Sequence, residues 1–247
     1  MITSKSNPQL KKVRQLIESA KARNEQGLFV IEGMRLVSEA PEELVECIYV
    51  SERMEQDAAQ IMAKGRYEIV SDDIFRSLSD TVNPQGVLAV VRKPRFGLDR
   101  VLGRSLYVIL DDIRDPGNLG TIVRTAEAAG AAVIMSRACV DIFNPKVIRS
   151  TMGSIFRVPF AICDKVEVVK TLQSQGVTVC AAVLDGSVPY REAPYTQANA
   201  FVIGNEANGV SPEVYTISDV RVRIPMNGKV ESLNAAISAA VLLYNMV

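Results

Sequence analysis

Two predicted strands near the end of the chain are each followed by a polar loop that contains glycine. The first strand, residues 201–203 (FVI), ends at Gly204 and leads into NEANGVS. The second, residues 221–224 (RVRI), leads into PMNGKV and then into an apolar helix that opens near Ser232. Parallel sheets are built from buried strands of this kind, and their ligands bind at the carboxyl ends of the strands. The two loops therefore predict a ligand pocket at that edge of a sheet.

Strands and helices alternate along the whole chain, which is the pattern of an α/β protein. After a helix that begins at Asn7 and Pro8, strands are expected at residues 29–31, 44–50, 67–70 and 86–91, and helices at 33–40, 52–64 and 72–78. Further strands are expected at 106–110, 131–135, 158–162 and 177–183, and helices at 118–129, 144–150, 165–173 and 233–247. Residues 92–99 (RKPRFGLD) are rich in proline, glycine and charge, as interdomain linkers are. We therefore expect two domains, 1–91 and 105–247, joined by a linker at 92–104.

The composition excludes several kinds of site. The 28 basic residues are balanced by 28 acidic ones, so a nucleic-acid-binding function would need a local basic patch. The chain has no histidine, which excludes histidine triads, histidine bases and histidine metal sites. Its four cysteines are widely spaced without a CxxC pair, so they predict buried thiols in a reducing compartment rather than a metal site or disulfides.

The two ends of the chain bear on its location. The polar, basic start (MITSKSNPQLKK) has no apolar core of a signal peptide behind it. The final apolar helix is too short to cross a bilayer. The sequence therefore predicts a cytoplasmic protein that does not interact with membranes.

The first helix has apolar residues at helical spacing and a basic opposite face. That opposite face carries Lys11, Lys12, Arg14, Lys21 and Arg23. Two interpretations stay open: a solvated face, or contact with RNA phosphates, to which Arg35 would add a further charge. Arg149, in the helix expected at 144–150, is likewise either a phosphate ligand or a surface residue.

Arg124 lies in a helix whose other residues are largely apolar, among them Ile122, Val123 and Ala126. An arginine in such a helix should have a partner or a function. Alternatively, its aliphatic stem packs on the helix and its guanidinium reaches solvent. The residues alone leave both interpretations open.

Three motifs in a fixed order resemble those of the SpoU family of RNA 2′-O-methyltransferases, within the SPOUT superfamily. They are LDDIRDPGNLGTIVRTAEAAGA at residues 110–131, then GNE at 204–206, then IPM at 224–226 with SLNAA at 232–236. The resemblance covers the chain from about Ser105 to its end. It implies a Rossmann-like parallel-sheet SPOUT domain with a C-terminal trefoil knot. More loosely, NPQLKKVRQL and GLFVIEGMRLVSEA resemble the family's substrate-binding domain, which implies a small L30e-like α/β domain in front.

The resemblance also implies a cofactor, S-adenosylmethionine, and a homodimer formed through the knotted domain. Cofactor-binding positions carried over from the family, with their neighbours, are Leu184, Gly204, Asn205, Ile224, Met226, Ser232 and Leu233. An adenine needs an apolar slot with a few main-chain donors and acceptors, which suits loops of this composition. The absence of GxGxxG also argues against a nicotinamide dehydrogenase.

The residues that match the family's catalytic positions are Asn118, Arg124, Glu206, Ser232 and Asn234. The family proposal makes the arginine the general base, but an ordinary arginine stays protonated at neutral pH. We therefore assign Arg124 first to holding the acceptor phosphate and stabilising the developing alkoxide. Asn118 and Glu206 are assigned to orienting either Arg124 or the acceptor. Ser232 and Asn234 are at a helix N-terminus, where they either bind phosphate or ribose hydroxyls or simply cap the helix.

The expected reaction is methylation of a ribose 2′-hydroxyl in RNA, with 23S ribosomal RNA as the preferred substrate because of the separate front domain. Transfer RNA is the first alternative. The second is a non-catalytic RNA-binding factor of ribosome assembly, which would not need all five motif residues. A generic nucleotide-binding α/β enzyme fits the composition but leaves the three motifs unexplained.

Overall fold

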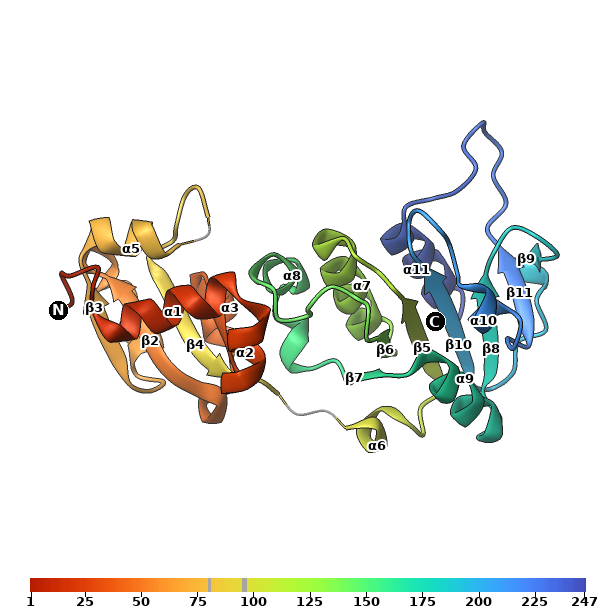
Figure 1. Cartoon of the computed structure of the whole chain (residues 1–247), viewed down its shortest axis with the longest axis horizontal. Helices are drawn as coiled ribbons and strands as arrows, with labels where there is room; N and C mark the ends of the chain where they lie inside the picture. The colour runs from red at the N-terminus through yellow and green to blue at the C-terminus, as the bar shows by residue number, and fades with distance from the viewer. Residues whose placement is uncertain (80, 95–96) are drawn as a thin grey trace. The chain divides into compact units, whose positions relative to one another are not determined.

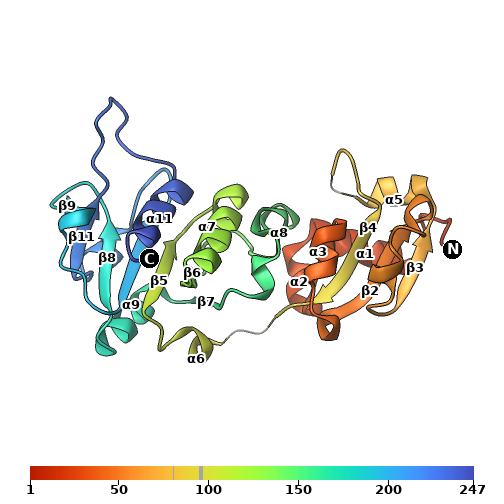
Figure 2. The same ribbon diagram turned by 180° about the vertical axis from the view of Figure 1, so that it is seen from behind.

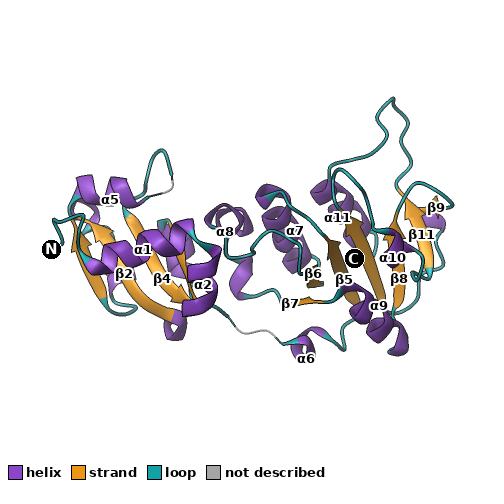
Figure 3. Cartoon of the chain, viewed as in Figure 1, coloured by secondary structure: helices purple, strands orange, loops and turns teal. Residues whose placement is uncertain are grey.

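The computed structural model describes residues 1–79, 81–94 and 97–247, which form two compact units (Figure 1). One unit comprises Met1–Arg95 and Asp141–Phe156, and the other comprises Phe96–Val140 and Arg157–Val247. The predicted alternation of strands and helices is confirmed (Figure 3). Residues 95 and 96 of the predicted linker lie outside the described residues, and the expected domain limits stay a prediction. No helix in the described part of the chain is both long and apolar enough to span a membrane.

The first unit contains a four-stranded mixed sheet in the order β1-β4-β2-β3. Its strands are β1 (Leu28–Glu32), β2 (Val45–Ser51), β3 (Tyr67–Val70) and β4 (Val87–Arg92). Strand β4 is antiparallel to both of its neighbours, and β2 pairs with β3 in parallel. The helical elements of the unit are α1 (Pro8–Glu18), α2 (Ala20–Gln26), α3 (Met34–Glu39), η1 (Glu42–Leu44), η2 (Glu52–Met54), α4 (Ala59–Met62), α5 (Asp72–Leu78), α8 (Pro145–Thr151) and η3 (Ser154–Phe156).

The expected basic face of the first helix is corrected at Arg23. The helix ends at Glu18, and Ser19 then caps α2 by accepting a hydrogen bond from the Ala22 amide. This break turns Arg23 inward, where its side chain is only 3% exposed. Its guanidinium donates to the carboxylate of Asp141 at 2.8 Å and to two carbonyl oxygens at the end of α1. Arg23 therefore serves the interior of the first unit.

The helix expected at residues 52–64 is also corrected. The structure has only the 3-10 turn η2 and the four-residue helix α4 in this stretch. In η2, α4 and the segment that connects them, the buried residues are Ala58 and Ile61. Two anchoring side chains stabilise a short turn of helix but not a continuous one of more than three turns.

The second unit contains a seven-stranded sheet in the order β7-β6-β5-β10-β8-β11-β9, and all its pairings are parallel. Its strands are β5 (Leu106–Asp111), β6 (Ala132–Ser136), β7 (Phe160–Cys163), β8 (Thr178–Ala182), β9 (Val188–Pro189), β10 (Asn199–Gly204) and β11 (Val220–Arg223). Central strands β5 and β10 are almost wholly buried, which explains their continuous apolar runs. The two-residue β9 and the adjoining turn η4 (Tyr190–Glu192) lie in a stretch for which the sequence predicted no strand or helix.

Helices cover both faces of this sheet (Figures 1 and 3). On one face, α6 (Leu98–Val101), α9 (Lys165–Ser174) and α10 (Pro212–Tyr215) contribute Val101, Val168 and Val214 to a core with Tyr107 and Ile109 of β5. On the other, α7 (Pro116–Ala128) and α11 (Ala235–Tyr244) pack against each other and α11 packs on β10 (Figure 2). This doubly covered parallel sheet is the predicted Rossmann-like architecture; the trefoil knot stays a prediction.

Two helices of the second unit, α7 and α11, each begin two residues away from the predicted start. Helix α7 begins at Pro116, two residues before the predicted start, and Asp115 is its N-cap. Proline is well suited to this position because its missing N–H would have no helical partner. Helix α11 begins at Ala235, and the Asn234 side chain caps it. Asn118 therefore lies inside the first turn of α7, and Asn234 lies just before α11.

Candidate functional site

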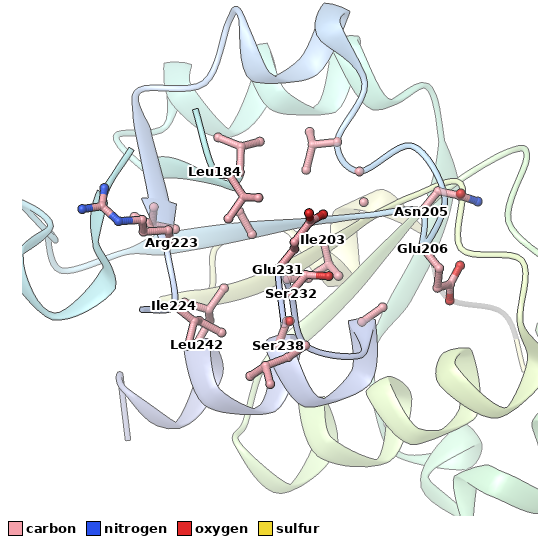
Figure 4. Close-up of a pocket in the computed structure, with 18 of the residues that line it drawn as sticks. Leu184, Ile203, Asn205, Glu206, Arg223, Ile224, Glu231, Ser232, Ser238 and Leu242 are labelled. Atoms are coloured by element: carbon pink, nitrogen blue, oxygen red, sulfur yellow. The ribbon is translucent and has the colours of Figure 1, made fainter. Parts of the chain in front are cut away.

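A pocket of about 770 Å³ lies in the second unit, where β8, β10 and β11 end (Figure 4). The lining comes from the ends of these three strands, the loops that follow them, Tyr215 of α10, and α11 with the residues just before it. All the residues for which the sequence predicts cofactor binding are among its lining residues: Leu184, Gly204, Asn205, Ile224, Met226, Ser232 and Leu233. Leu184 and Ile224 lie on one side of the pocket and Asn205 and Glu206 on the other (Figure 4). Their function stays a prediction, but the structure brings these positions to one cavity.

The loop after β10 is a closed turn that only glycine permits at its start. Asn205 and Gly209 exchange two backbone hydrogen bonds, of 3.1 and 2.8 Å. This folds the chain back on Gly204, so that a Cβ atom there would lie 2.0 Å from the carbonyl carbon of Gly209. Gly209 has a φ of 67°, in the region that favours glycine. The turn presents Glu206 beyond the end of the strand.

Three of the five predicted catalytic residues form a chain of hydrogen bonds. The Asn118 side-chain amide donates to Oε1 of Glu206 at 2.5 Å. The Asn234 side-chain amide in turn donates to Oδ1 of Asn118 at 2.9 Å. The three residues come from the first turn of α7, the loop after β10 and the N-cap of α11. The chain is exposed to solvent and therefore accessible to a large substrate.

The direction of this chain follows from the helix cap at its end. Oδ1 of Asn234 accepts hydrogen bonds from the Ala236 and Ile237 amides, so its NH₂ group must face Asn118. Asn118 then accepts with its oxygen, which leaves its NH₂ group to donate to Glu206. The Asn118 backbone N–H is itself bound by the Asp115 carboxylate at 2.8 Å. Helix capping therefore orients both amides, and the Glu206 carboxylate is the terminal acceptor.

The other two predicted catalytic residues lie apart from this chain. Ser232 is exposed on the pocket wall, and the described residues give its hydroxyl no hydrogen bond. Arg124 lies on the exposed side of α7, outside the pocket lining, with no ion pair or hydrogen bond to any described residue. Its guanidinium reaches solvent, which matches one of the two conformations that the sequence left open. The function of both residues stays a prediction.

The residues predicted to bind RNA all belong to the first unit. Lys11 and Lys12 are exposed on α1, where Arg14 is half-buried. Arg35 is exposed on α3 and forms an ion pair of 3.0 Å with Glu39. Arg149, on α8, is half-buried and has partners of its own. The sequence therefore placed these five residues on helices correctly, but their contact with RNA stays a prediction.

Two arginines of the pocket wall were missed by the sequence analysis. Arg221 lies over the ring of Tyr215, with its guanidinium carbon 5.1 Å from the ring centroid. Arg223 donates to the carbonyl oxygen of Ser187, in the loop after β8. The sequence RVRI contained a signal for them. Side chains alternate along a strand, so the two arginines on either side of the buried Val222 share the opposite face.

The pocket fits an adenosyl group by its chemistry and size. Leu184, Ile203, Ile224, Leu233 and Leu242 supply apolar walls, and Asn205, Glu206, Ser232 and Asn234 supply polar groups. Sites for ligands of this size occupy about 300–1,000 Å³ and are lined mostly by apolar residues with a few polar groups. Among the described residues, no cluster of cysteine and acidic side chains has the arrangement of a metal site.

Comparison with known proteins agrees with this architecture. Residues 105–244 match the SpoU rRNA Methylase family, and residues 7–89 match the MRM3-like substrate binding domain. The chain is 34% identical to the Bacillus subtilis 23S rRNA (guanosine(2553)-2′-O)-methyltransferase RlmP, with 99% of this chain and 98% of that protein covered.

Two solved structures extend the similarity to the whole fold. The AdoMet-bound rRNA methyltransferase from Sinorhizobium meliloti has a TM-score of 0.90 and 32% identity, with 99% of this chain and 96% of that chain covered. The SpoU methyltransferase AviRb from Streptomyces viridochromogenes, in complex with AdoMet, has a TM-score of 0.87 and 28% identity, with 97% of each chain covered. From its motifs, its fold and these similarities, the chain belongs to the SpoU rRNA methylase family.

Proposed function

We propose that this protein methylates a ribose 2′-oxygen of RNA, with 23S ribosomal RNA as its substrate and S-adenosylmethionine as its methyl donor. The observation that carries the proposal is that the predicted cofactor pocket and three of the predicted catalytic residues lie side by side in the second unit. A pocket lined by the GNE, IPM and SLN loops adjoins a polar chain of three motif residues, Asn118, Glu206 and Asn234. The named activity of the Bacillus subtilis relative supports the substrate and the position of methylation.

Leu184, Ile224, Met226 and Leu233 would hold the adenosine part of the cofactor in the apolar part of the pocket. Gly204 and Asn205, which line the pocket at the end of β10, would supply polar groups beside it. S-adenosylmethionine, when bound, supplies an electrophilic methyl group. The acceptor hydroxyl must approach this group in line and lose its proton, because a neutral ribose hydroxyl is a poor nucleophile.

The protein's own residues orient the acceptor and stabilise its alkoxide from the exposed side of the pocket, and the hydroxyl proton passes to solvent water. The Glu206 carboxylate, fixed by Asn118, is the hydrogen-bond acceptor that orients the acceptor nucleotide. Ser232 and Asn234 lie before α11, where a helix N-terminus favours phosphate and ribose oxygens. Arg124 has an exposed guanidinium with which it binds the acceptor phosphate and stabilises the alkoxide. We assign it this electrostatic function rather than that of a base.

The first unit is proposed to bind the RNA around the target nucleotide, with Lys11, Lys12, Arg14, Arg35 and Arg149 as phosphate ligands. These residues would form the local basic patch that a chain of zero net charge needs. We also propose a cytoplasmic homodimer. Helix α11 leaves Ile237 and Tyr244 half exposed, and a second copy of the chain would cover them. The measured mass in solution tests the dimer.

The direct test uses RNA from a strain that lacks this gene, incubated with the protein and methyl-labelled S-adenosylmethionine. After separation by size, the RNA is hydrolysed in alkali, which spares linkages next to a 2′-O-methyl group. We expect label in alkali-stable dinucleotides from the large ribosomal RNA. Label in transfer RNA would keep the reaction and replace the substrate. Cofactor binding without any label in deproteinised RNA or in ribosomal precursor particles would favour a non-catalytic assembly factor.

A further inference from the structure

Asp111, the last residue of β5, is a fully buried carboxylate that makes two directed contacts. Its Oδ1 accepts a hydrogen bond from Nζ of Lys165 at 2.6 Å. Its Oδ2 accepts from the backbone N–H of Ser211 at 2.7 Å. Strand pairing aligns Asp111 with Gly204, so it lies beside the point at which the GNE loop leaves β10. Ser211 is at the other end of that loop.

Lys165, the first residue of α9, is the cation that compensates this buried charge. Its side chain is only 14% exposed, and its Nζ also lies 3.0 Å from Oε1 of Glu213 and 3.7 Å from Oδ2 of Asp112. Burial alone would lower the pKa of Lys165, but its hydrogen bonds to Asp111 and Glu213 outweigh burial and raise it. Its raised pKa keeps Lys165 charged at neutral pH, opposite the Asp111 carboxylate.

Asp112 holds the beginning of the same loop. Its φ of 62° is in the left-handed region, which is uncommon for residues other than glycine. Ser136 holds it there by two hydrogen bonds, one with the Asp112 backbone N–H at 3.0 Å and one with its carboxylate at 2.6 Å. In this conformation the Asp112 carbonyl oxygen accepts a hydrogen bond of 3.0 Å from the Asn205 side chain.

The loop that carries Glu206 is thus held at both ends by two consecutive residues: Asp111, the last residue of β5, and Asp112, which follows it. Asn205 is bound by Asp112, and Ser211 is bound by Asp111. From Asp112 the chain leads within four residues into α7, which carries Asn118. One network therefore sets the positions of both partners of the hydrogen bond between Asn118 and Glu206.

We propose that Lys165 is a positioning residue for methyl transfer, which acts through Asp111 and Asp112 on the Glu206 loop. This inference rests on the proposed function. Lys165 lies outside the pocket lining and contacts none of the predicted catalytic residues, so it neither binds the cofactor nor touches the reacting atoms. Without its charge, the buried carboxylate of Asp111 has no cation and must reorient toward solvent. The Ser211 contact is then lost, and Glu206 is no longer held in line with Asn118.

The test compares three variants with the wild type: Lys165→Met, Glu213→Gln and the double variant Asp111→Asn with Lys165→Met. Glu213→Gln is the matched control, because it removes a partner of the same lysine but leaves Asp111 and the loop untouched. Hydrogen exchange of peptides that cover residues 204–211 reports loop order. The turnover number is calculated per cofactor-binding site, and these sites are titrated in each preparation. Unfolded protein therefore does not lower the measured kcat.

For Lys165→Met we expect faster exchange in residues 204–211 and a fall in kcat of about tenfold to a hundredfold, as for a displaced catalytic group. The cofactor Kd and the KM for RNA should stay near the wild-type values, which a general loss of structure would not produce. Glu213→Gln should match the wild type in exchange and in kcat. Wild-type exchange in the loop, or wild-type kcat, in Lys165→Met overturns the proposal.

If Lys165→Met does not fold, the double variant decides the question by the same criteria. It removes the uncompensated charge, but an asparagine at 111 has a single acceptor end, and without the lysine nothing holds that end toward the Ser211 N–H. Faster loop exchange and slower turnover are therefore again expected, and wild-type values of both overturn the proposal. If the wild type itself transfers no methyl group to any RNA, the proposed function fails. Loop exchange in Lys165→Met then still shows whether Lys165 positions the loop.

Discussion

The Asn234 side chain donates a hydrogen bond of 2.9 Å to the side-chain amide oxygen (Oδ1) of Asn118, between residues that are 116 positions apart in the sequence. The same side chain caps α11 with its oxygen. Capping and catalysis, which the sequence left as alternatives for Asn234, are therefore compatible: one end of the amide satisfies the helix, and the other end orients the polar chain that leads to Glu206.

Asn234→Asp separates these two functions. Aspartate caps helices as well as asparagine does, so we expect little change in thermal stability. It cannot donate to Asn118, however, and its charge would turn the Asn118 amide away from Glu206. Turnover should fall by about a hundredfold, as expected when a catalytic group is misplaced. The melting temperature measures stability, and the methyl-transfer rate measures turnover. Calorimetric titration with S-adenosylmethionine checks that cofactor binding is retained.

Asn234→Ala is the comparison, because it removes the cap as well. We expect an additional loss of about 1 kcal/mol in the free energy of unfolding, with cofactor binding retained. Wild-type turnover in Asn234→Asp would show that the residue only caps the helix.

Arg124→Ala should abolish methyl transfer and leave stability almost unchanged. The side chain is exposed and has no ion-pair or hydrogen-bond partner among the described residues, so its removal breaks no polar contact there. The alkoxide and the acceptor phosphate, in contrast, would lose a cation. Single-turnover rates with saturating RNA and cofactor, together with thermal unfolding, measure both effects. A mutant with the turnover of the wild type would remove Arg124 from the mechanism.

Gly204→Ala should disrupt the pocket. The added Cβ would lie 2.0 Å from the Gly209 carbonyl carbon, so the closed turn must open. We expect a loss of about 1–3 kcal/mol in the free energy of unfolding and weaker cofactor binding. Gly228→Ala is the matched control, since a Cβ there meets no atom within 4 Å. Calorimetric titration with S-adenosylmethionine measures the binding of each. Equal affinity in both variants would contradict the assigned role of the turn.

Arg23→Met should destabilise the first unit. It leaves the Asp141 carboxylate and two carbonyl oxygens of α1 without their buried donor. Loss of one partner of a buried ion pair costs about 3 kcal/mol or more. Lys21→Met, on the same helix, is the control, because the exposed pair of Lys21 with Glu25 contributes at most about 0.5 kcal/mol. Urea unfolding of both variants measures the difference; equal midpoints would mean that Arg23 contributes no more than a surface residue.

The sequence by itself determined the local elements and the identity of the pocket loops. Strands β5 and β10 were predicted to within two residues, because an uninterrupted apolar run has few conformations that bury it. The pocket loops were identified by turn residues at strand ends, since all parallel strands of a sheet end at the same edge. Where local signals were weaker, as for the stretch that forms η2 and α4, the predicted helix was wrong.

Only the tertiary structure decided which distant side chains meet. Arg23 was assigned to an exposed basic face, because its partner Asp141 is 118 residues away and no periodicity reports it. The contacts of Asn118 with Glu206 and Asn234, and of Lys165 with Asp111, likewise join residues brought together by the order of strands in the sheet. Hydrogen bonds and ion pairs act over a few ångströms, so their partners are set by packing and topology rather than by neighbours along the chain.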